Sequence, residues 1–184
     1  MLTVNFSPFP NLKTDRLILR RLTIEDENEI FFLRSDENIN WYVDRPKPNS
    51  LEDARNRIDK LNNGIDNNEF IFWGITLLTN PAIIGTICLW NISKENYTAE
   101  VGFDLMTHFQ GKGIMKEAFS EVIRHGFEIL KVRRLVAWVN HENSRSISLL
   151  SKFNFIRDMS EEEKTGKIEL GNMLIYTLNV TNYY

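Results

Sequence analysis

Cysteine is nearly absent from this chain of 184 residues, and the one present is Cys88. A single cysteine excludes an internal disulfide, so we expect a protein of the reducing cytoplasm. Cys88 lies in an apolar stretch, which favours an inert core position. The three histidines are scattered without the spacing of metal ligands, and the sequence therefore predicts no metal site.

Long apolar runs and a strong excess of one charge are also missing. No run approaches the ~20 residues needed to cross a bilayer, and the first fourteen residues lack the charged-then-apolar order of a signal peptide. The net charge is −3 and the pI is near 5.7, which gives no bulk attraction to nucleic acid. We therefore expect neither a membrane nor a nucleic acid among the partners.

The composition that is present, 42% hydrophobic and 26% charged, is that of an ordinary globular protein. A chain of this length can bury roughly 70% of the surface of its unfolded state. It contains no internal repeats, low-complexity tracts or linker-like stretches. We expect a single domain over residues 1–184.

The most informative segment is a six-residue turn with the sequence QGKGIM, residues 110–115. It follows an apolar stretch, 99–106, that reads as a strand, and it precedes a segment whose apolar residues fall on one helical face. Gly111 and Gly113 would leave main-chain N–H groups uncovered at a helix N-terminus, where unpaired donors and the helix dipole favour an anion. The turn predicts a phosphate site. The alternative is that the glycines only shape a connection.

Two familiar phosphate loops do not fit this turn. A Walker loop needs four residues between its glycines and then Gly-Lys-Ser/Thr, and the chain has no such run. The Rossmann fingerprint needs a third glycine three residues after Gly113, where Lys116 stands. A different phosphate-binding architecture is therefore indicated.

Hydrophobic periodicity predicts one mixed α/β fold. The expected strands are 16–21, 70–78, 83–90, 99–106, 134–139, 155–157 and 173–178. Helices are expected after a Thr-x-x-Asp cap at Thr23, from Ser50 to about residue 61, over 115–130 with His125 on the polar side, and over 143–152. A turn is expected at 62–68 and a polar loop at 160–167.

This order of elements resembles the GCN5-related N-acetyltransferase (GNAT) superfamily. The turn matches the first four positions of its Gln/Arg-x-x-Gly-x-Gly/Ala signature and departs at Met115. The segments TDRLILR at 14–20, EVGF at 100–103 and NSRS to KFNF at 143–155 resemble the ribosomal-protein N-terminal (Rim-type) branch. The resemblance implies a twisted, mostly antiparallel sheet of about seven strands, with helices on both faces and a splay between the fourth and fifth strands.

The resemblance also implies that acetyl-CoA binds at this splay, with its pyrophosphate on the turn and its pantetheine hydrogen-bonded along the strand before it. The Leu105 N–H would polarise the thioester carbonyl, as a preorganised donor does. Lys112 would add a charge to phosphate or remain a solvated loop lysine. The residues assigned to the coenzyme are Phe103, Leu105, Gln110, Gly111, Lys112, Gly113, Ile114, Met115, Asn143 and Ser146.

Proton transfer is assigned less directly. Many members of the superfamily use a tyrosine to protonate the leaving thiolate, and that position falls on Leu150. Ser146 is the substitute, unless it is a plain helix-surface serine. Glu100 is the candidate base, and an outward-facing Glu100 in a cross-strand ion pair is the alternative. His141 and Glu142 are secondary candidates.

The scarcity of bases bears on the acceptor. An α-amine has a pKa of ~8, whereas a lysine amine at ~10.4 needs about 4.6 kcal/mol of help to be neutral at pH 7. The sequence therefore favours a protein N-terminal α-amine or another amine of low pKa. Trp41 and Tyr42 are expected to contact the acceptor, on a segment that ends in Pro46 and Pro48 and could act as a lid.

The predicted function is an acetyl-CoA-dependent N-acetyltransferase that moves acetyl directly to a primary amine, without a covalent enzyme intermediate. Three alternatives stay open: a non-catalytic acetyl-CoA-binding regulatory module, a transferase for a small amine such as a polyamine or antibiotic, and an interaction domain without a cofactor. The sequence also leaves open the identity of the acceptor and the oligomeric state, a homodimer included.

Overall fold

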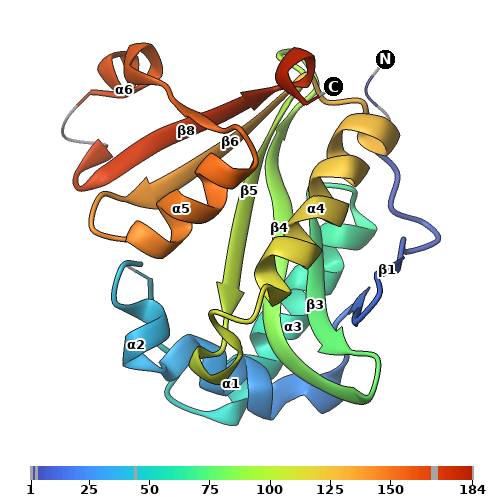
Figure 1. Ribbon diagram of the computed structural model, residues 1–184. Helices are drawn as coiled ribbons and strands as arrows, with labels where there is room; N and C mark the ends of the chain where they lie inside the picture. Colours follow the sequence, from blue (N-terminus) through green and yellow to red (C-terminus); the bar gives the residue numbers. More distant parts are fainter. Residues whose placement is uncertain (1, 3, 44, 167–169, 184) are drawn as a thin grey trace.

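The fold is an eight-stranded sheet with helices on both faces (Figure 1), and the computed structural model describes residues 2, 4–43, 45–166 and 170–183. The strands lie in the order β1-β2-β3-β4-β5-β6-β8-β7. Their bounds are β1 Leu12–Lys13, β2 Leu17–Arg20, β3 Ile71–Leu77, β4 Asn80–Ser93, β5 Thr98–Leu105, β6 Arg134–Asn140, β7 Ile156–Arg157 and β8 Met173–Asn179. The helices are α1 Glu27–Ser35, α2 Glu37–Asn40, α3 Leu51–Asp66, α4 Ile114–Arg124, α5 Ser144–Lys152 and α6 Met159–Thr165.

The sheet opens between β5 and β6, its one parallel pair within the described part of the chain. Pairing runs only from Thr98 opposite Arg134 to Glu100 opposite Val136. Both strands then continue, and they diverge toward their C-terminal ends (Figure 1). The predicted splay is confirmed at this position.

The two faces of the sheet carry separate hydrophobic cores. The larger core joins the sheet to α4 and α5 through residues such as Trp73, Phe119 and Leu150. The smaller core joins it to α1 and α3 through Leu33 and Ile58. Because side chains alternate along a strand, β5 contributes to both faces.

On β5, the alternation separates apolar from charged side chains. Val101 and Leu105 belong to the larger core, and the Phe103 ring packs edge-on against Phe119 of α4 with centroids 5.4 Å apart. Glu100 and Asp104 therefore point to the opposite face, the one that α1 and α3 partly cover. This alternation decides which side chains lie on each face of β5.

Three element predictions are corrected by the structure. Helix α3 continues to Asp66, through most of the turn expected at 62–68, because Leu61 and Ile65 are buried on its apolar face. The loop expected at 160–167 contains α6, which begins where the Asp158 carboxylate accepts from the Glu161 N–H. The eighth strand is β1, whose two residues pair with β2.

The prediction that His125 lies on the polar side of its helix is wrong. The chain is α-helical to Arg124 and then forms a π-helical turn over His125–Leu130. At the helical spacing i, i+4, i+7, His125 continues the buried stripe of Ala118 and Val122, so the ordinary α period already places it on the apolar face. His125 is buried with its ring edge-on to Trp73, and desolvation lowers its pKa to about 4.

Candidate active site

The turn before α4 presents a row of uncovered main-chain donors. Gly111 and Gly113 have φ of 74° and 75°, a left-handed conformation that glycine adopts without strain. Among the described residues, nothing accepts a hydrogen bond from the N–H groups of residues 111–116, and the first amide to be paired is that of Glu117, which donates to Gly113 O at 3.1 Å. A Cβ at Gly111 would meet no atom within 4 Å. This concave set of donors fits a diphosphate.

An ion pair from the N-terminal strand region holds the turn in place. Glu117 in α4 accepts from the Arg16 N–H at 2.9 Å, from Arg16 Nε at 2.6 Å and from the Thr14 hydroxyl. Arg16 Nη1 also donates to Lys112 O at 3.1 Å. Arg16 thus ties both the carbonyl side of the turn and the first turn of α4 to β2.

Gln110 connects the turn to the splayed strand and to α5. Its Nε2 donates to Leu105 O at 2.9 Å, and its Oε1 accepts from Arg145 Nη1 at 2.6 Å. The Gln110 side chain, expected to bind the coenzyme, is therefore occupied in holding three elements together at the mouth of the splay.

Ile114 and Met115 can offer only their main chain to a ligand, since their side chains are buried in the larger core. The departure at Met115 from a small residue in the signature is accommodated in this way. The Lys112 side chain is exposed, with Nζ 5.7 Å above the Phe109 ring.

The edge of β5 offers further main-chain groups beside the turn. The Met106 N–H donates to Ile84 O of β4 at 2.9 Å. Because main-chain groups alternate between the two edges of a strand, those of Phe103 and Leu105 face the side from which β6 has departed. The coenzyme assignment of these two residues is compatible with this geometry.

Glu100 lies at the point where pairing between β5 and β6 ends. Its neighbours across the strands are Trp90 of β4 and Val136 of β6. Desolvation raises the pKa of Glu100 to about 7, against a lowering effect from Asn91, whose Nδ2 donates at 3.4 Å. No described residue forms an ion pair with Glu100, so the cross-strand ion pair considered from the sequence is absent from this part of the chain.

The other two residues assigned to the coenzyme, Asn143 and Ser146, lie at the start of α5. The Asn143 side-chain oxygen accepts from the Ser146 N–H at 3.1 Å, which caps the helix. Ser146 is partly exposed on the first turn. Leu150, one turn further along, is buried in the larger core, where a proton donor would be out of reach.

The two predicted acceptor residues follow α2. The Trp41 side chain is 74% exposed, and Tyr42 is half-buried. Their segment is fastened by Arg45, whose Nε donates to Asn40 Oδ1 at 2.6 Å and whose Nη1 reaches Asp104 Oδ2 at 2.8 Å. The contact between Arg45 and Asp104 therefore holds this segment against the free end of β5.

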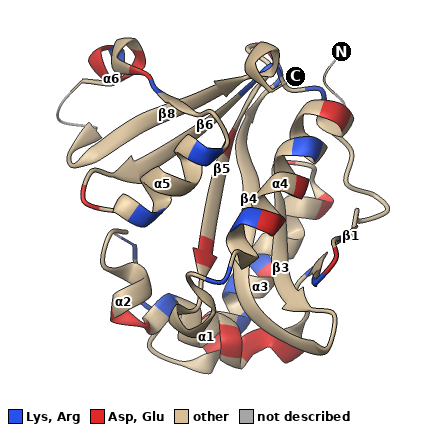
Figure 2. Ribbon diagram, viewed as in Figure 1, with Lys and Arg blue, Asp and Glu red and all other residues tan. Residues whose placement is uncertain are grey.

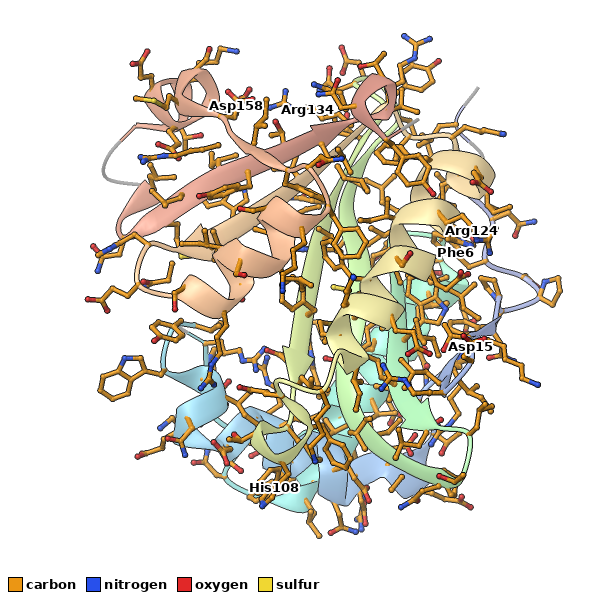
Figure 3. The ribbon with its side chains drawn as sticks, in the orientation of Figure 1. Phe6, Asp15, His108, Arg124, Arg134 and Asp158 are labelled. Carbon is orange, nitrogen blue, oxygen red and sulfur yellow. The ribbon has the colours of Figure 1, made fainter. Side chains whose placement is uncertain are left out.

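His108, which has no assigned role, and the secondary candidates His141 and Glu142 are all exposed. His108 is exposed on the turn region, at the opposite end of the molecule from Arg134 and Asp158 (Figure 3). The ion pair between Arg134 and Asp158, at 2.5 Å, closes the end of the sheet where β5 and β6 stay paired. His141 and Glu142 are exposed between β6 and α5.

Sequence reasoning missed several residues that build the site. Arg16 and Arg145 lie inside segments that carry the family resemblance, so a role for each could have been predicted. Their pairing with Glu117 and Gln110 could not. The pair between Arg45 and Asp104 spans 59 residues, and no spacing rule indicates it.

Two further searches gave negative results within the described residues. No group of three or more His, Cys, Asp or Glu there is placed to hold a metal ion. In the same part of the chain, no helix is both long and apolar enough to cross a membrane.

A mixed sheet that splays beside an uncovered turn at a helix N-terminus defines an acetyltransferase of the GNAT type. Residues 16–156 match the family described as "Acetyltransferase (GNAT) domain". The chain belongs to this family and is an N-acetyltransferase. The family uses acetyl-CoA.

Among relatives, the Bacillus subtilis (strain 168) protein named "Uncharacterized N-acetyltransferase YoaA" is 31% identical over 150 residues, 82% of this chain and 85% of its own. Ribosomal-protein-S5-alanine acetyltransferase from Vibrio fischeri has the same fold, with a TM-score of 0.76, 20% identity and coverage of 95% of this chain and 99% of its own. The microcin C7 self-immunity acetyltransferase MccE, solved with acetyl-CoA and AMP, has a TM-score of 0.74, 22% identity and coverage of 91% and 94%.

Proposed function

We propose that this protein transfers acetyl directly from acetyl-CoA to a primary amine, and that the acceptor is a protein N-terminal α-amine of the kind found on ribosomal proteins. The observation that carries the donor half is the row of uncovered N–H groups at residues 111–116, placed next to the free edge of β5. The acceptor half is supported by Glu100 and by the name of one structural neighbour, the ribosomal-protein-S5-alanine acetyltransferase.

The residues present fit acetyl-CoA, which supplies an activated acetyl thioester when bound. The amides of the turn, Gly111 to Met115, hold its diphosphate, and Gly113 keeps their approach open. The main chain of Phe103 and Leu105 holds the pantetheine in place of the lost β6 neighbour, and the Leu105 N–H is preorganised to stabilise charge on the carbonyl oxygen.

Glu100 removes the proton from the acceptor amine, directly or through one water. Its pKa of about 7 means that roughly half of the carboxyl is ionised at neutral pH, which is the range in which a general base is efficient. A base of this strength suits an α-amine with a pKa of ~8 better than a lysine amine at ~10.4. This match favours a protein N-terminus over a lysine side chain.

Ser146 protonates the departing sulfur. It lies on the first turn of α5, and Asn143 fixes that turn by accepting from its N–H. A weak donor is sufficient here, because a thiol with a pKa near 8.5 leaves readily as the thiolate. The buried Leu150 cannot take over this role.

Direct transfer is supported by the state of Cys88. Desolvation raises the pKa of its thiol to about 12, and its Sγ lies 3.5 Å from Gly102 O. Because the thiolate is the nucleophilic form of cysteine, such a group is a poor acetyl carrier. We therefore do not expect Cys88 to carry the acetyl group between the thioester and the amine.

The experiment is a coenzyme A thiol-release assay with acetyl-CoA and a panel of amines: peptides with free N-termini, the same peptides with blocked N-termini and a free lysine, polyamines and aminoglycosides. We expect turnover with free N-terminal peptides and little with the blocked ones. Turnover with polyamines or aminoglycosides alone would overturn the acceptor proposal. Acetyl-CoA binding without any turnover would indicate a regulatory module, and no binding in calorimetry would indicate an interaction domain.

A further inference from the structure

Three arginines from different elements converge beside the acceptor face of β5. Arg34 comes from α1, Arg45 from the segment after α2 and Arg57 from α3, and with Asp104 they line one small cavity of about 40 Å³. On this measure one water molecule needs only roughly 10–15 Å³, so the cavity has room for a small polar group. In Figure 2, basic positions on α1, α3 and the segment after α2 surround the acidic position at the free end of β5. We call Arg34, Arg45 and Arg57 the arginine cluster.

The charges in the arginine cluster do not balance. Among the described residues, Asp104 is the one carboxylate that lines the cavity, and it is paired with Arg45 Nη1 at 2.8 Å. Arg45 Nη2 is buried without a hydrogen-bond partner in the described structure. Arg34 donates only to Pro46 O, at 3.2 Å, and Arg57 has no hydrogen bond or ion pair with any described residue.

Outside the cluster, every partly buried arginine in the described part of the chain is paired with a carboxylate, whereas the exposed Arg133 and Arg145 are not. Arg20 pairs with Asp26 at 2.7 Å, and Arg21 pairs with Asp66 at 2.7 Å. Arg55, two residues before Arg57 on α3, is paired with Glu27. The surplus of positive charge is therefore local to the arginine cluster.

The surplus has an energetic consequence. Desolvation and then repulsion by Arg45 lower the pKa of Arg34 to about 10, and the same two causes lower the pKa of Arg57. Partly desolvated cations without partners are unfavourable, and an anion at this position would relieve both effects. Guanidinium groups bind carboxylate and phosphate with paired, charge-assisted hydrogen bonds.

The arginine cluster lies on the same side of the sheet as the candidate base. Glu100 and Asp104 point to one face of β5, four residues apart, which is about 13 Å along the strand. The Leu105 N–H, which is assigned to the thioester carbonyl, is next to Asp104 on β5, so the arginine cluster lies beside the donor end of this stretch. An acceptor whose amine meets the thioester therefore extends its remaining groups toward the arginine cluster.

We propose that the arginine cluster is an acceptor subsite for an anionic group, so that the preferred acceptor is an amine carrying a carboxylate or phosphate close to the reacting nitrogen. This inference rests on the proposed N-acetyltransferase reaction and adds the charge of its substrate. Two sources share the chemistry: a peptide with an acidic residue next to its N-terminus, and a small free amine such as an amino acid.

The kinetic test compares matched acceptors. The peptide arm uses Ala-Glu and Ala-Gln N-termini, and the small-molecule arm uses an amino acid and its amide. We expect the wild-type protein to prefer the anionic member of at least one pair by about tenfold in kcat/KM. In Arg57→Gln the preference falls to about twofold through a higher KM for the anionic acceptor, whereas Arg57→Lys retains part of it. Arg55→Gln, on the same helix, leaves the preference unchanged.

A binding test does not depend on turnover. Inorganic phosphate is expected to raise the Tm of the wild-type protein and of Arg55→Gln by about 2 °C more than it raises the Tm of Arg57→Gln. Phosphate on the turn before α4 contributes equally to all three proteins and cancels in this comparison. If no amine is acetylated, this readout still decides whether the anion subsite exists.

Two results would overturn the inference. One is an equal rate for anionic and neutral acceptors in both arms. The other is an Arg57→Gln protein that is less stable than Arg55→Gln but responds identically to phosphate and to acceptor charge. That second outcome would mean that Arg57 only covers apolar surface with its aliphatic stem.

Discussion

The two faces of β5 differ in how they treat their polar groups. On the face toward α4, the polar donors belong to the main chain, and side chains such as Phe103 and Met115 pack into the core. The ion pair between Arg16 and Glu117 holds the turn in place. On the other face, the polar groups are side chains held partly desolvated, namely Glu100 and the arginine cluster.

This difference matches what each side has to recognise. The family uses one coenzyme, and the main-chain donors that we propose for it are fixed by the fold. An acceptor varies, and side chains on a less regular surface can change with it. Recognition of the acceptor is therefore proposed to depend on charged side chains, Glu100 and the arginine cluster, that are not required for folding.

The largest expected effect is that of Glu100→Gln on turnover. Loss of a general base lowers kcat by about 100- to 1000-fold, while acetyl-CoA affinity stays near normal because the amides at residues 111–116 are untouched. In the wild type, kcat/KM rises as pH increases through about 7, since the carboxylate is the active form and the pKa is raised to about 7. Steady-state kinetics from pH 6 to 9 check this, with the exposed Glu95→Gln as the control.

Equal pH profiles for wild type and Glu100→Gln would remove Glu100 from the mechanism. The acceptor amine also titrates, but at a pKa of ~8 or above. The rise of kcat/KM that its deprotonation causes is therefore expected in both proteins.

Gly113→Val is expected to weaken acetyl-CoA binding by about 10- to 100-fold. A β-branched residue is strained at φ of 75°, and its side chain would crowd the approach to the turn, 3.5 Å from Arg16 Nη2. Isothermal titration calorimetry measures the affinity. Gly171→Val is the matched control, because Gly171 also has a positive φ, 55°, with open space around it. A folded Gly113→Val protein with normal affinity would show that the turn does not hold the diphosphate.

Ser146→Ala is expected to lower kcat by roughly tenfold, with acetyl-CoA affinity nearly unchanged, because a proton donor to a good leaving group contributes modestly. Ser148→Ala, on the exposed side of α5, is the control. A wild-type rate for Ser146→Ala would return Ser146 to the role of a helix-surface serine.

Arg145→Ala should have a smaller effect on donor binding, about two- to fivefold in Kd. It removes one hydrogen bond, to Gln110 Oε1, and leaves the turn itself intact. The exposed Lys152→Ala at the other end of α5 is the control for helix stability. A loss as large as that of Gly113→Val would mean that the α5 connection, rather than the glycine turn, organises the donor site.

A further expected effect is on stability. The native state keeps the Glu100 proton up to about pH 7, whereas an unfolded glutamate releases it near 4.3. The contribution of Glu100 to stability therefore falls as pH rises from about 4.3 through 7. Glu100→Gln should gain Tm relative to wild type at pH 8 and not at pH 4.5, and thermal unfolding at the two values measures this. A pH-independent difference would contradict the raised pKa.

The donor side was largely predictable from sequence because its signals are local. The glycine turn, the strand before it and the helix after it lie within about 30 residues. The splay between β5 and β6 came from the family resemblance and is present.

The acceptor side was not predictable in the same way. Trp41 and Tyr42 were found as aromatic residues near a proline-containing segment, but the contact that fastens that segment joins Arg45 to Asp104 across 59 residues. The placement of His125 failed because its polar side chain outweighed its position, which continues the buried stripe of Ala118 and Val122 at helical spacing. Long-range pairing leaves no regular trace in a single sequence.

The central claim is that uncovered amides before α4 receive the diphosphate of acetyl-CoA. Titration of acetyl-CoA into ¹⁵N-labelled protein, followed by amide NMR, reports on these nitrogens one by one. The account predicts that the resonances of residues 111–116 shift together and saturate with the calorimetric affinity. Saturable binding that leaves all of these resonances in place while other amides move would contradict it.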